Sequence, residues 1–321
     1  MRHDEEYVHS GIATCMRAPY VAMDEAAGYD VVVLGVPLDY AVSFRSGQRH
    51  GPRAIREATF WHRLAGGVYM DLATRTPREA TRLTIADLGD AVLWPADPER
   101  NIDRIAQTVR AARSAAFPVI LGGDHSLTYA AFLGCREALA QRGVAPVGLL
   151  HFDAHLDVER EYLTLPRVHH GNFLGELVRE GHVRGEHVVS IGARGIEAAE
   201  CARFVDDHGI RLYGAGEVRE RTLAAILAEA CATLAARCAA VYVTFDIDAI
   251  DPAQAPGTGT PVAGGLNAHD VLSVLPALAR LPLAAFDLVE VCPPLDPSGL
   301  TAVVAADLLW QVLAFGLGSR V

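Results

Sequence analysis

The sequence predicts a single α/β domain, a three-layer αβα sandwich built around a mainly parallel β-sheet. Seven short runs are apolar along their whole length instead of alternating with polar residues, which is expected when helices cover both faces of a parallel sheet. Longer segments rich in Ala, Leu and Arg separate these runs. No proline-rich linker, low-complexity tract or charge block divides the 321 residues. We therefore expect one domain over 1–321, with 1–28 as an N-terminal extension.

The apolar runs define the expected strands, and the segments between them define the expected helices. In chain order, the strands cover 30–36, 82–88, 117–123, 146–152, 187–193, 241–247 and 283–291. The helices cover 99–115, 127–142, 219–239 and 299–314, and the apolar end of the chain, 308–317, is expected to be buried helix. Two Gly/Pro-rich stretches, 256–265 and 292–299, follow strands and are short enough to be loops. Because ligands of open α/β sheets bind beyond the carboxyl ends of the strands, we expect the functional site beside these loops.

The composition limits the classes of partner. The formal net charge is −11 at pH 7, which argues against a nucleic acid or an anionic membrane and is compatible with a cationic ligand. The six cysteines are scattered without a CxxC pair, so neither a disulfide framework nor a thiolate zinc site is expected. The N-terminus "MRHDEEYVHSG" has no apolar signal core, and no apolar run approaches the ~18 residues of a membrane span. We therefore expect a cytoplasmic protein.

Three polar clusters follow three of the expected strands: "GGDHS" (122–126), "DAHLD" (153–157) and "DID" (246–248). In an extended chain alternate side chains point the same way, so the polar groups within each cluster should share a face. Together they offer four carboxylates and two imidazoles: Asp153, Asp157, Asp246, Asp248, His125 and His155. Such a group would repel itself without cations, whereas two divalent ions would neutralise it. A carboxylate-rich set with no thiol suits Mn²⁺ better than a structural zinc.

The chain resembles the ureohydrolases, the family of arginase, agmatinase, guanidinobutyrase, guanidinopropionase and formiminoglutamase. The resemblance runs through "GIATCMRAP" (11–19), "FRSGQRHGPRAIRE" (44–57), "LGGDHS", "FDAHLD", "HHGN" (169–172), "FDIDAIDPAQAPGTGTPVAGGL" (245–266) and "DLVEVCPPLD" (287–296). The opening and the "PGTGTP" segment are more similar to the agmatinase and guanidinobutyrase branch than to arginase. The resemblance implies an arginase/deacetylase-like fold, a hydrolase acting on C–N bonds of linear amidines, and a homotrimer or homohexamer.

The resemblance also implies a binuclear centre with two Mn²⁺ per subunit. Carried over by position, Asp153 and Asp246 bridge the two ions. Each ion then gains one more imidazole and one more carboxylate, which are His125 with Asp157 for one ion and His155 with Asp248 for the other. The three polar clusters would therefore line one metal centre.

Three residues are implied in the chemistry: Asp157, His170 and Glu290. Glu290 matches the family's guanidinium-binding glutamate, and a carboxylate can accept two parallel N–H bonds from that planar group. The amine leaving group must gain a proton, which Asp157 or a nearby histidine could deliver. His170 aligns with the family's proposed proton shuttle, and its neighbour His169 is a competitor for that role.

The substrate that the resemblance implies is agmatine, hydrolysed to urea and putrescine. The segment between Asp157 and His170 is expected to frame the substrate tail, and it carries both signs of charge. The candidates for the ammonium of agmatine are Glu159 and Glu161, and those for the carboxylate of guanidinobutyrate or guanidinopropionate are Arg160 and Arg167. Asn172 stands where agmatinase-like relatives usually carry Thr, so the sequence leaves the substrate open.

Two other classes of function remain as alternatives. A zinc-dependent deacetylase is similar in fold and uses Asp and His ligands, but it needs one metal site. Asp157, Asp248 and Glu290 instead favour two ions and a guanidinium. A non-catalytic subunit can arise when an enzyme loses its ligands, whereas all six candidate ligands are present in this chain.

Overall fold

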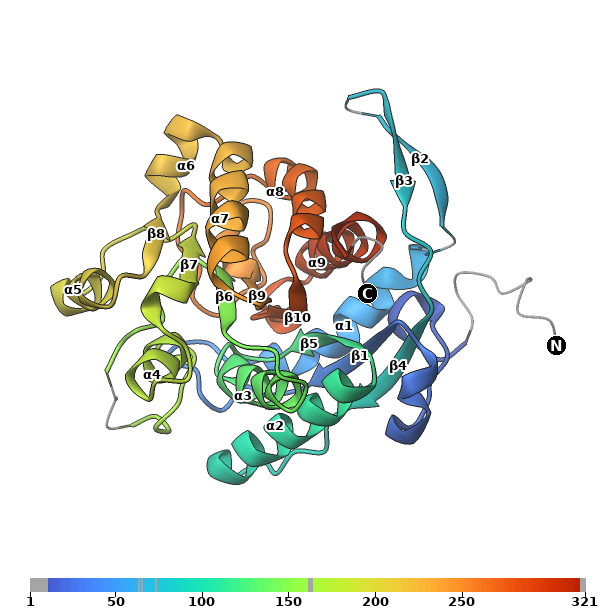
Figure 1. The fold of residues 1–321 in the computed structure, drawn as a ribbon, viewed down its shortest axis with the longest axis horizontal. Helices are drawn as coiled ribbons and strands as arrows, with labels where there is room; N and C mark the ends of the chain where they lie inside the picture. Colours follow the sequence, from blue (N-terminus) through green and yellow to red (C-terminus); the bar gives the residue numbers. More distant parts are fainter. Residues whose placement is uncertain (1–10, 63, 65, 73, 161–163, 318–321) are drawn as a thin grey trace.

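The computed structural model describes residues 11–317 apart from 63, 65, 73 and 161–163. Its centre is a parallel eight-stranded sheet with the order β4-β1-β5-β10-β9-β6-β7-β8 (Figure 1). The strands are β1 (Val31–Val36), β4 (Ile85–Asp90), β5 (Phe117–Gly122), β6 (Val147–Phe152), β7 (Val188–Ile191), β8 (Arg211–Tyr213), β9 (Ala240–Asp246) and β10 (Leu283–Val289). All seven expected strands are present, and β8 is a further short strand at one edge of the sheet.

Helices cover both faces of this sheet. They are α1 (Gly51–Ala58), α2 (Pro98–Ala115), α3 (Leu127–Ala140), α4 (Phe173–Arg179), α5 (Ala199–His208), α6 (Ala215–Arg221), α7 (Leu223–Arg237), α8 (Ala268–Val274) and α9 (Leu300–Gln311). One core cluster joins α2, α3, α4 and α5 to one face of the sheet, and another joins α1, α7, α8 and α9 to the opposite face (Figure 1). The predicted three-layer αβα architecture is confirmed.

The strands are mainly apolar because each of their faces packs against helices. In β1, Val31 and Val33 belong to the core cluster of α7–α9, whereas Leu34 and Val36 belong to the cluster of α2–α5. Every position of β1, β5, β6, β7 and β9 is buried. The apolar end of the chain is buried as expected, since α9 continues into a π-helical turn, Val312–Gly316, within the core.

Two local expectations are wrong. The helix expected over 219–239 is two helices, α6 and α7, because Thr222 between them has a φ of 72°, which no α-helix accepts. Its hydroxyl then caps α7 by accepting a hydrogen bond from the Ala225 N–H. The strand expected from residue 82 begins only at Ile85.

A β-hairpin that the sequence did not indicate projects from the body of the molecule (Figure 1). It consists of β2 (Gly67–Asp71) and β3 (Thr76–Ala80), paired antiparallel. Its inner face packs through Tyr69 against the ring of Trp310, 5.5 Å between centroids, while Val68 and Met70 on its outer face are exposed.

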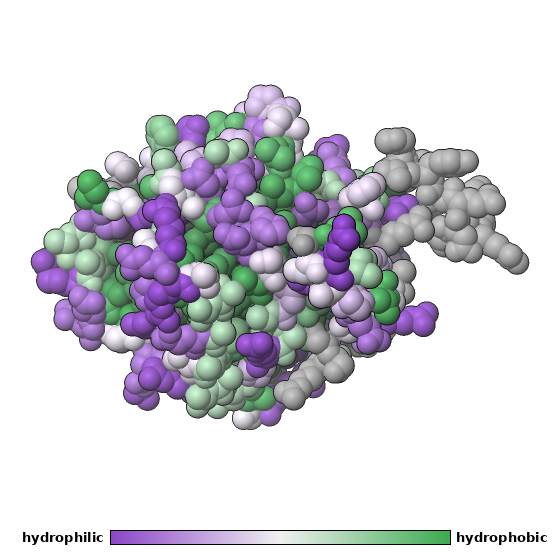
Figure 2. Space-filling model, turned by 90° about the horizontal axis from the view of Figure 1, so that it is seen from above, coloured by the Kyte–Doolittle hydropathy of each residue, from purple (hydrophilic) through white to green (hydrophobic). Residues whose placement is uncertain are grey.

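On the face of the molecule in Figure 2, hydrophilic and hydrophobic residues are interspersed.

Three further features bear on the expectations from composition. All six cysteines are buried free thiols, as the absence of a disulfide framework predicts. In the described part of the chain, no helix is both long and apolar enough to cross a membrane. The described part of the N-terminal segment packs on the body, where the buried Cys15 donates its backbone N–H to Asp87 at 2.8 Å.

The strand order places the polar motifs side by side. The adjacent strands β5, β10, β9 and β6 form the middle of the sheet and are all parallel, so their carboxyl ends lie at the same edge. The motifs "GGDHS", "VEV", "DID" and "DAHLD" follow these four strands in that order. Segments as far apart in sequence as 125 and 290 therefore meet at one site.

Candidate metal centre and substrate pocket

The loop after β5 presents His125 because its backbone comes unusually close to a neighbouring segment. A Cβ atom at Gly123 would lie 1.8 Å from the Leu38 carbonyl oxygen, so only glycine fits there. The Asp124 carboxylate then closes the turn by accepting N–H bonds from Ser126 at 3.0 Å and from Ala41 at 3.3 Å. His125 follows, 1% exposed, at the edge of the sheet.

The two aspartate motifs converge through tight turns, not through extended chain as the sequence argument assumed. β6 ends at Phe152 and β9 at Asp246. The Asp153 carboxylate accepts the backbone N–H of His155 at 2.6 Å, and Asp246 accepts that of Asp248 at 2.7 Å. These matching Asx-type turns fix each pair of side chains in one place.

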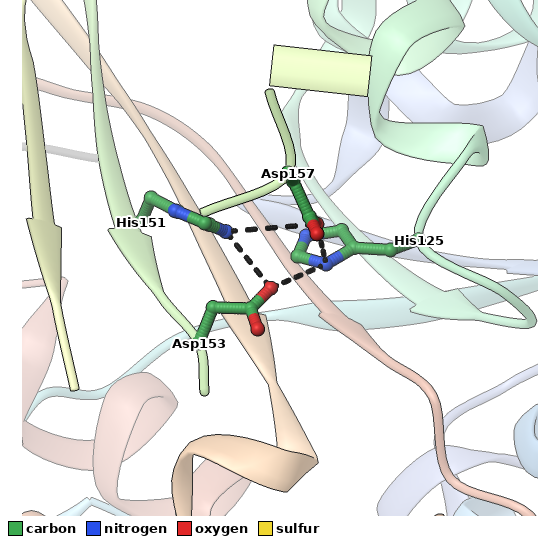
Figure 3. Close-up of side chains that lie close together, drawn as sticks. All are labelled: His125, His151, Asp153 and Asp157. Carbon is green, nitrogen blue, oxygen red and sulfur yellow. Dashed lines mark hydrogen bonds and ion pairs between the residues drawn. The ribbon is translucent and has the colours of Figure 1, made fainter. Parts of the chain in front are cut away.

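Four of the predicted side chains meet at one point. The Nδ1 atom of His125 lies 3.0 Å from an Asp153 oxygen, 3.2 Å from an Asp157 oxygen and 3.2 Å from an Asp246 oxygen. Figure 3 shows His125, from the loop after β5, and Asp153 and Asp157, from the loop after β6, pointing toward one another. Asp157 reaches this point through a left-handed backbone, with a φ of 52°, a strained conformation that is typical of functional sites.

The other two side chains complete a second group on the far side of Asp153. The Nδ1 atom of His155 lies 3.2 Å from Asp153 Oδ1 and 3.2 Å from Asp248 Oδ2. Asp153 therefore turns Oδ2 toward His125 and Oδ1 toward His155. One carboxylate is thus shared by two groups of potential metal ligands.

These groups fit divalent ions in both spacing and chemistry. Ligand atoms about 2.1 Å from an octahedral ion lie about 3 Å apart, which matches the separations of 3.0 to 3.2 Å around His125 Nδ1. His125 Nδ1 and Asp248 Oδ2 are buried and have no hydrogen-bond partner among the described residues. A bound cation in each group would satisfy both atoms.

The electrostatics of the cluster also favour cations. Burial and the charge of Asp153 raise the pKa of Asp157 to about 8. Burial, reinforced by Asp248 and Asp153, raises the pKa of Asp246. A bound divalent ion would favour the ionised form of both carboxylates and so oppose these increases in pKa.

Sequence reasoning missed His151, which lies one residue before the end of β6. It is fully buried, and its Nε2 atom lies 2.9 Å from Asp153 Oδ2 (Figure 3). Its Nδ1 atom lies 3.1 Å from the hydroxyl of Ser190. Because His151 stands inside an apolar strand, only the pairing of β6 with β7 reveals its polar surroundings.

Glu290 follows β10 and is held in place before any substrate arrives. Its carboxylate accepts the backbone N–H of His125 and the side-chain amide of Gln48, each at 2.9 Å. Its φ of 64° is a second left-handed non-glycine conformation at the site. Burial raises the pKa of Glu290, but contact with His170 outweighs burial and lowers it, so the group is ionised at neutral pH.

Of the two adjacent histidines, His170 faces the site. Its Nδ1 atom lies 3.6 Å from Glu290, and its Nε2 atom accepts the Ser43 N–H at 3.0 Å. Burial lowers the pKa of His170, but Glu290, Asp157 and Asp124 together outweigh burial and raise it to about 9. The hydrogen bond from the Ser43 N–H is one that the neutral ring accepts. His169 instead lies in the loop, where its backbone N–H donates a hydrogen bond to the Asn172 side chain. Burial lowers the pKa of the His169 ring to about 4.

A pocket with a volume of about 190 Å³ opens over the cluster. Its lining residues are Ser43, His155, Asp157, Glu159, His170, Gly171, Glu197 and Thr260. Glu159 and Glu197 are the carboxylates that this lining adds beyond the cluster, and it includes no Arg or Lys among the described residues. A Cβ atom at Gly171 would lie 2.6 Å from a Glu159 carboxylate oxygen, so glycine leaves room for this side chain.

The basic candidates from the same loop point elsewhere. Arg167 pairs with Glu180 and lies over the ring of Tyr129, and Arg160 is exposed outside the pocket lining. Glu161 lies outside the described residues. Glu197 was not foreseen, because it follows β7 in a loop that carries no motif.

Comparisons with known proteins agree with this geometry. The arginase family model matches residues 29–314. The chain is 35% identical to guanidinopropionase from Pseudomonas aeruginosa, over 95% of this chain and 91% of that protein. It is 34% identical to agmatinase from Chromobacterium violaceum, over 98% and 92%. The solved structure of proclavaminate amidinohydrolase from Streptomyces clavuligerus superimposes with a TM-score of 0.83 at 32% identity, over 96% and 99%. The protein therefore belongs to the arginase family and is an amidinohydrolase that acts on C–N bonds of guanidino compounds.

Proposed function

We propose that the protein is a binuclear manganese amidinohydrolase that converts agmatine to urea and putrescine. The observation that carries the choice of agmatine is the acidic lining of the pocket, Glu159 and Glu197, beside the Asp/His cluster. Burial, together with the charges of Glu159 and Asp153, raises the pKa of Glu197. A cationic substrate tail would relieve this cost, whereas a carboxylate tail would increase it.

Asp153 and Asp246 are the proposed bridging ligands of two Mn²⁺ ions, in a shell of carboxylates and imidazoles that suits this ion. His125 and Asp157 would complete one shell, and His155 and Asp248 the other. Two ions bound there would lower the pKa of water and so supply a nucleophile at neutral pH.

The chain's own residues orient the substrate and move the proton. Glu290, ionised and fixed by Gln48 and His125 N–H, would hold the guanidinium through paired N–H bonds. This places the guanidinium carbon over the Asp/His cluster and opposes rotation of the planar group. The leaving amine would take a proton from His170, with Asp157 as the alternative donor.

The relatives supply one second candidate, because guanidinopropionase is as similar to this chain as agmatinase is. A guanidino acid would need a cation for its carboxylate. Arg167 is already paired with Glu180, so agmatine is the better fit. We retain the homotrimer or homohexamer and the cytoplasmic location as further proposals.

Substrate choice can be measured as urea release by the Mn²⁺-loaded protein. Agmatine, guanidinobutyrate, guanidinopropionate, arginine and free guanidine are supplied at equal concentration, beside a metal-free control. We expect agmatine to have the highest kcat/KM. Faster turnover of guanidinobutyrate or guanidinopropionate would overturn the assignment of agmatine while keeping the family chemistry.

The acidic lining can be tested by Glu159→Gln and Glu197→Gln. Loss of a charge-assisted contact of about 1.5–3 kcal/mol should lower kcat/KM for agmatine about 10- to 150-fold, mainly through KM. Turnover of free guanidine should change little, because it has no tail. Glu200→Gln, an exposed acid on α5, is the control and should leave both activities unchanged. Equal losses with agmatine and free guanidine would contradict a tail-binding role.

His170 should set the alkaline limb of the pH profile. If it donates the proton, kcat declines as the pH rises through a pKa no higher than about 9, because only the protonated ring can donate. His170→Asn should lower kcat about 10²- to 10⁴-fold and remove that limb. His169→Asn, at the neighbouring ring that points away, should keep the limb. An unchanged limb in His170→Asn would exclude His170 as the donor.

A further inference from the structure

Four buried polar side chains form a continuous row across the middle of the sheet. The register pairs Asp287 of β10 with Thr244 of β9, Thr244 with His151 of β6, and His151 with Ser190 of β7. Paired residues of parallel strands project from the same face. None of the four is more than 1% exposed. The row is a polar exception in the core, because the neighbours of these residues along the strands are apolar. We call Asp287, Thr244, His151 and Ser190 the polar row.

Two members of the polar row contact residues of the metal cluster: Thr244 lies behind His125, and His151 lies beside Asp153 within the same group of potential ligands. The Thr244 hydroxyl lies 2.8 Å from His125 Nε2, on the side of the ring opposite the three carboxylates. His151 Nε2 lies 2.9 Å from Asp153 Oδ2, and the Ser190 hydroxyl lies 3.1 Å from His151 Nδ1. The polar row therefore contacts His125, which would bind one of the proposed ions, and Asp153, which would bind both.

Asp287 ends the polar row and contacts no member of the metal cluster. Its Oδ2 atom accepts hydrogen bonds from Tyr242 at 2.7 Å and from Thr128 at 2.8 Å. Its Oδ1 atom has no hydrogen-bond partner, and no ion pair reaches it, among the described residues. A wholly buried carboxylate with no cation beside it destabilises a fold, so its presence calls for a compensating role.

The hydrogen-bond directions show how Asp287 can act at a distance. If Nε2–H of His125 donates to Thr244, the Nδ1 lone pair faces the three carboxylates, as a metal ligand requires. The hydroxyl hydrogen of Thr244 is then free to point at Asp287, its cross-strand neighbour, or at the Thr128 hydroxyl, which lies 3.5 Å away and itself donates to Asp287. Burial raises the pKa of Asp287, and His125 and the Thr244 hydroxyl are among the groups that oppose this increase.

We propose that the polar row is an outer support of the metal centre and that Asp287, through Thr244, is a positioning residue for His125. This inference rests on the proposed metal centre. Asp287 fixes the tautomer and orientation of His125 and adds negative charge behind it, which strengthens the binding of the cation in front. In return, the bound cations offset the burial of the Asp287 charge.

Asp287→Asn separates this role from a purely structural one. The variant keeps the size of the side chain and an oxygen that accepts from Tyr242 and Thr128, while it removes a buried charge. We expect the dissociation constant of Mn²⁺, measured by equilibrium dialysis of the metal-free protein, to rise about 10- to 100-fold. We expect the thermal midpoint of the metal-free variant to equal or exceed that of the metal-free wild type. A structural role would instead lower that midpoint.

Three further variants complete the design. Asp87→Asn makes the same chemical change at a 1% exposed residue of the same sheet that is paired with Arg56; it should lower the thermal midpoint and leave Mn²⁺ binding unchanged. Thr244→Val should weaken Mn²⁺ binding as Asp287→Asn does, and Thr244→Ser should restore it because the hydroxyl returns.

The outcomes distinguish this inference from the proposed function. Wild-type protein that binds no Mn²⁺ would refute the proposed metal centre itself. If the wild type binds two ions and Asp287→Asn binds Mn²⁺ with a dissociation constant within about twofold of the wild-type value, only the role of Asp287 is refuted. Loss of such a partner should raise this constant at least about 10-fold. A loss of Mn²⁺ binding that merely follows a lower thermal midpoint would also refute it.

Discussion

Replacing Asp153 or Asp246 by alanine is expected to abolish both metal retention and urea release. Asp153 turns one oxygen toward each group of potential ligands, and Asp246 reaches His125 while fixing the turn that carries Asp248. Either change removes a ligand shared by both proposed ions. Because the ions supply several kcal/mol of transition-state stabilisation, urea release should fall at least about 10³-fold.

The measurement is the manganese content after gel filtration, with urea release from the same fractions. The thermal midpoint of the metal-free variants is the folding control, because each replacement also removes the Asx turn that follows β6 or β9. Asp207→Ala, an exposed acid on α5, is the control. Either active-site variant that retained near-wild-type manganese and activity would refute the bridging assignment.

Glu290→Gln is expected to remove most activity while leaving the metals in place. The wild-type carboxylate is ionised because His170 lowers its pKa. Its hydrogen bond to a proposed ligand residue is with the backbone N–H of His125, not with a metal-binding side-chain atom. The neutral amide still accepts that bond but no longer pairs with a guanidinium. The loss of a buried, hydrogen-bonded charge pair is worth about 2–5 kcal/mol, which is about 30- to 4,000-fold in kcat/KM.

Manganese content and kcat/KM for agmatine are measured together in this variant. Two ions per chain with a large loss of kcat/KM would support the guanidinium-binding role. Gln48→Ala provides a graded comparison, because it removes one hydrogen bond that orients Glu290 without removing the charge, and should cost less. Loss of the metals in Glu290→Gln would instead make Glu290 part of the metal centre.

Much of the fold is predictable because burial leaves a strong signal. A strand covered on both faces is buried at every position and mainly apolar, and this holds for β1, β5, β6, β7 and β9. Short β8, which forms only three ladder positions at an edge, leaves little signal. The hairpin β2–β3 leaves none, since most of its residues are exposed, including the apolar Val68 and Met70.

The grouping of the site residues is also predictable, but the reason given from sequence is wrong. Alternation along an extended chain predicts that Asp153, His155 and Asp157 share a face. In fact the chain leaves the sheet at Phe152, an Asx turn presents His155, and the φ of 52° at Asp157 turns that side chain back. The spacing of these residues predicts that they lie together, whereas the backbone turns determine how their side chains are oriented.

His151 and Glu197 lie beyond sequence reasoning for different physical reasons. The polar contacts of His151 are with Ser190 on the neighbouring strand and with Asp153. Its role therefore cannot be recognised without the strand order β9-β6-β7. Glu197 enters the pocket through the folding of the loop after β7. The choice between acidic and basic groups for the substrate tail became possible only when Arg167 was found to pair with Glu180.

The most direct test of the central claim is a titration of metal-free protein with Mn²⁺, in which bound metal and urea release from agmatine are followed in the same samples. The arrangement of His125, Asp153, His155, Asp157, Asp246 and Asp248 predicts that urea release reaches its plateau at two Mn²⁺ per chain. A protein that binds one zinc per chain and releases no urea from any guanidino compound would contradict the claim and favour a deacetylase. A protein that binds no metal would favour a non-catalytic subunit.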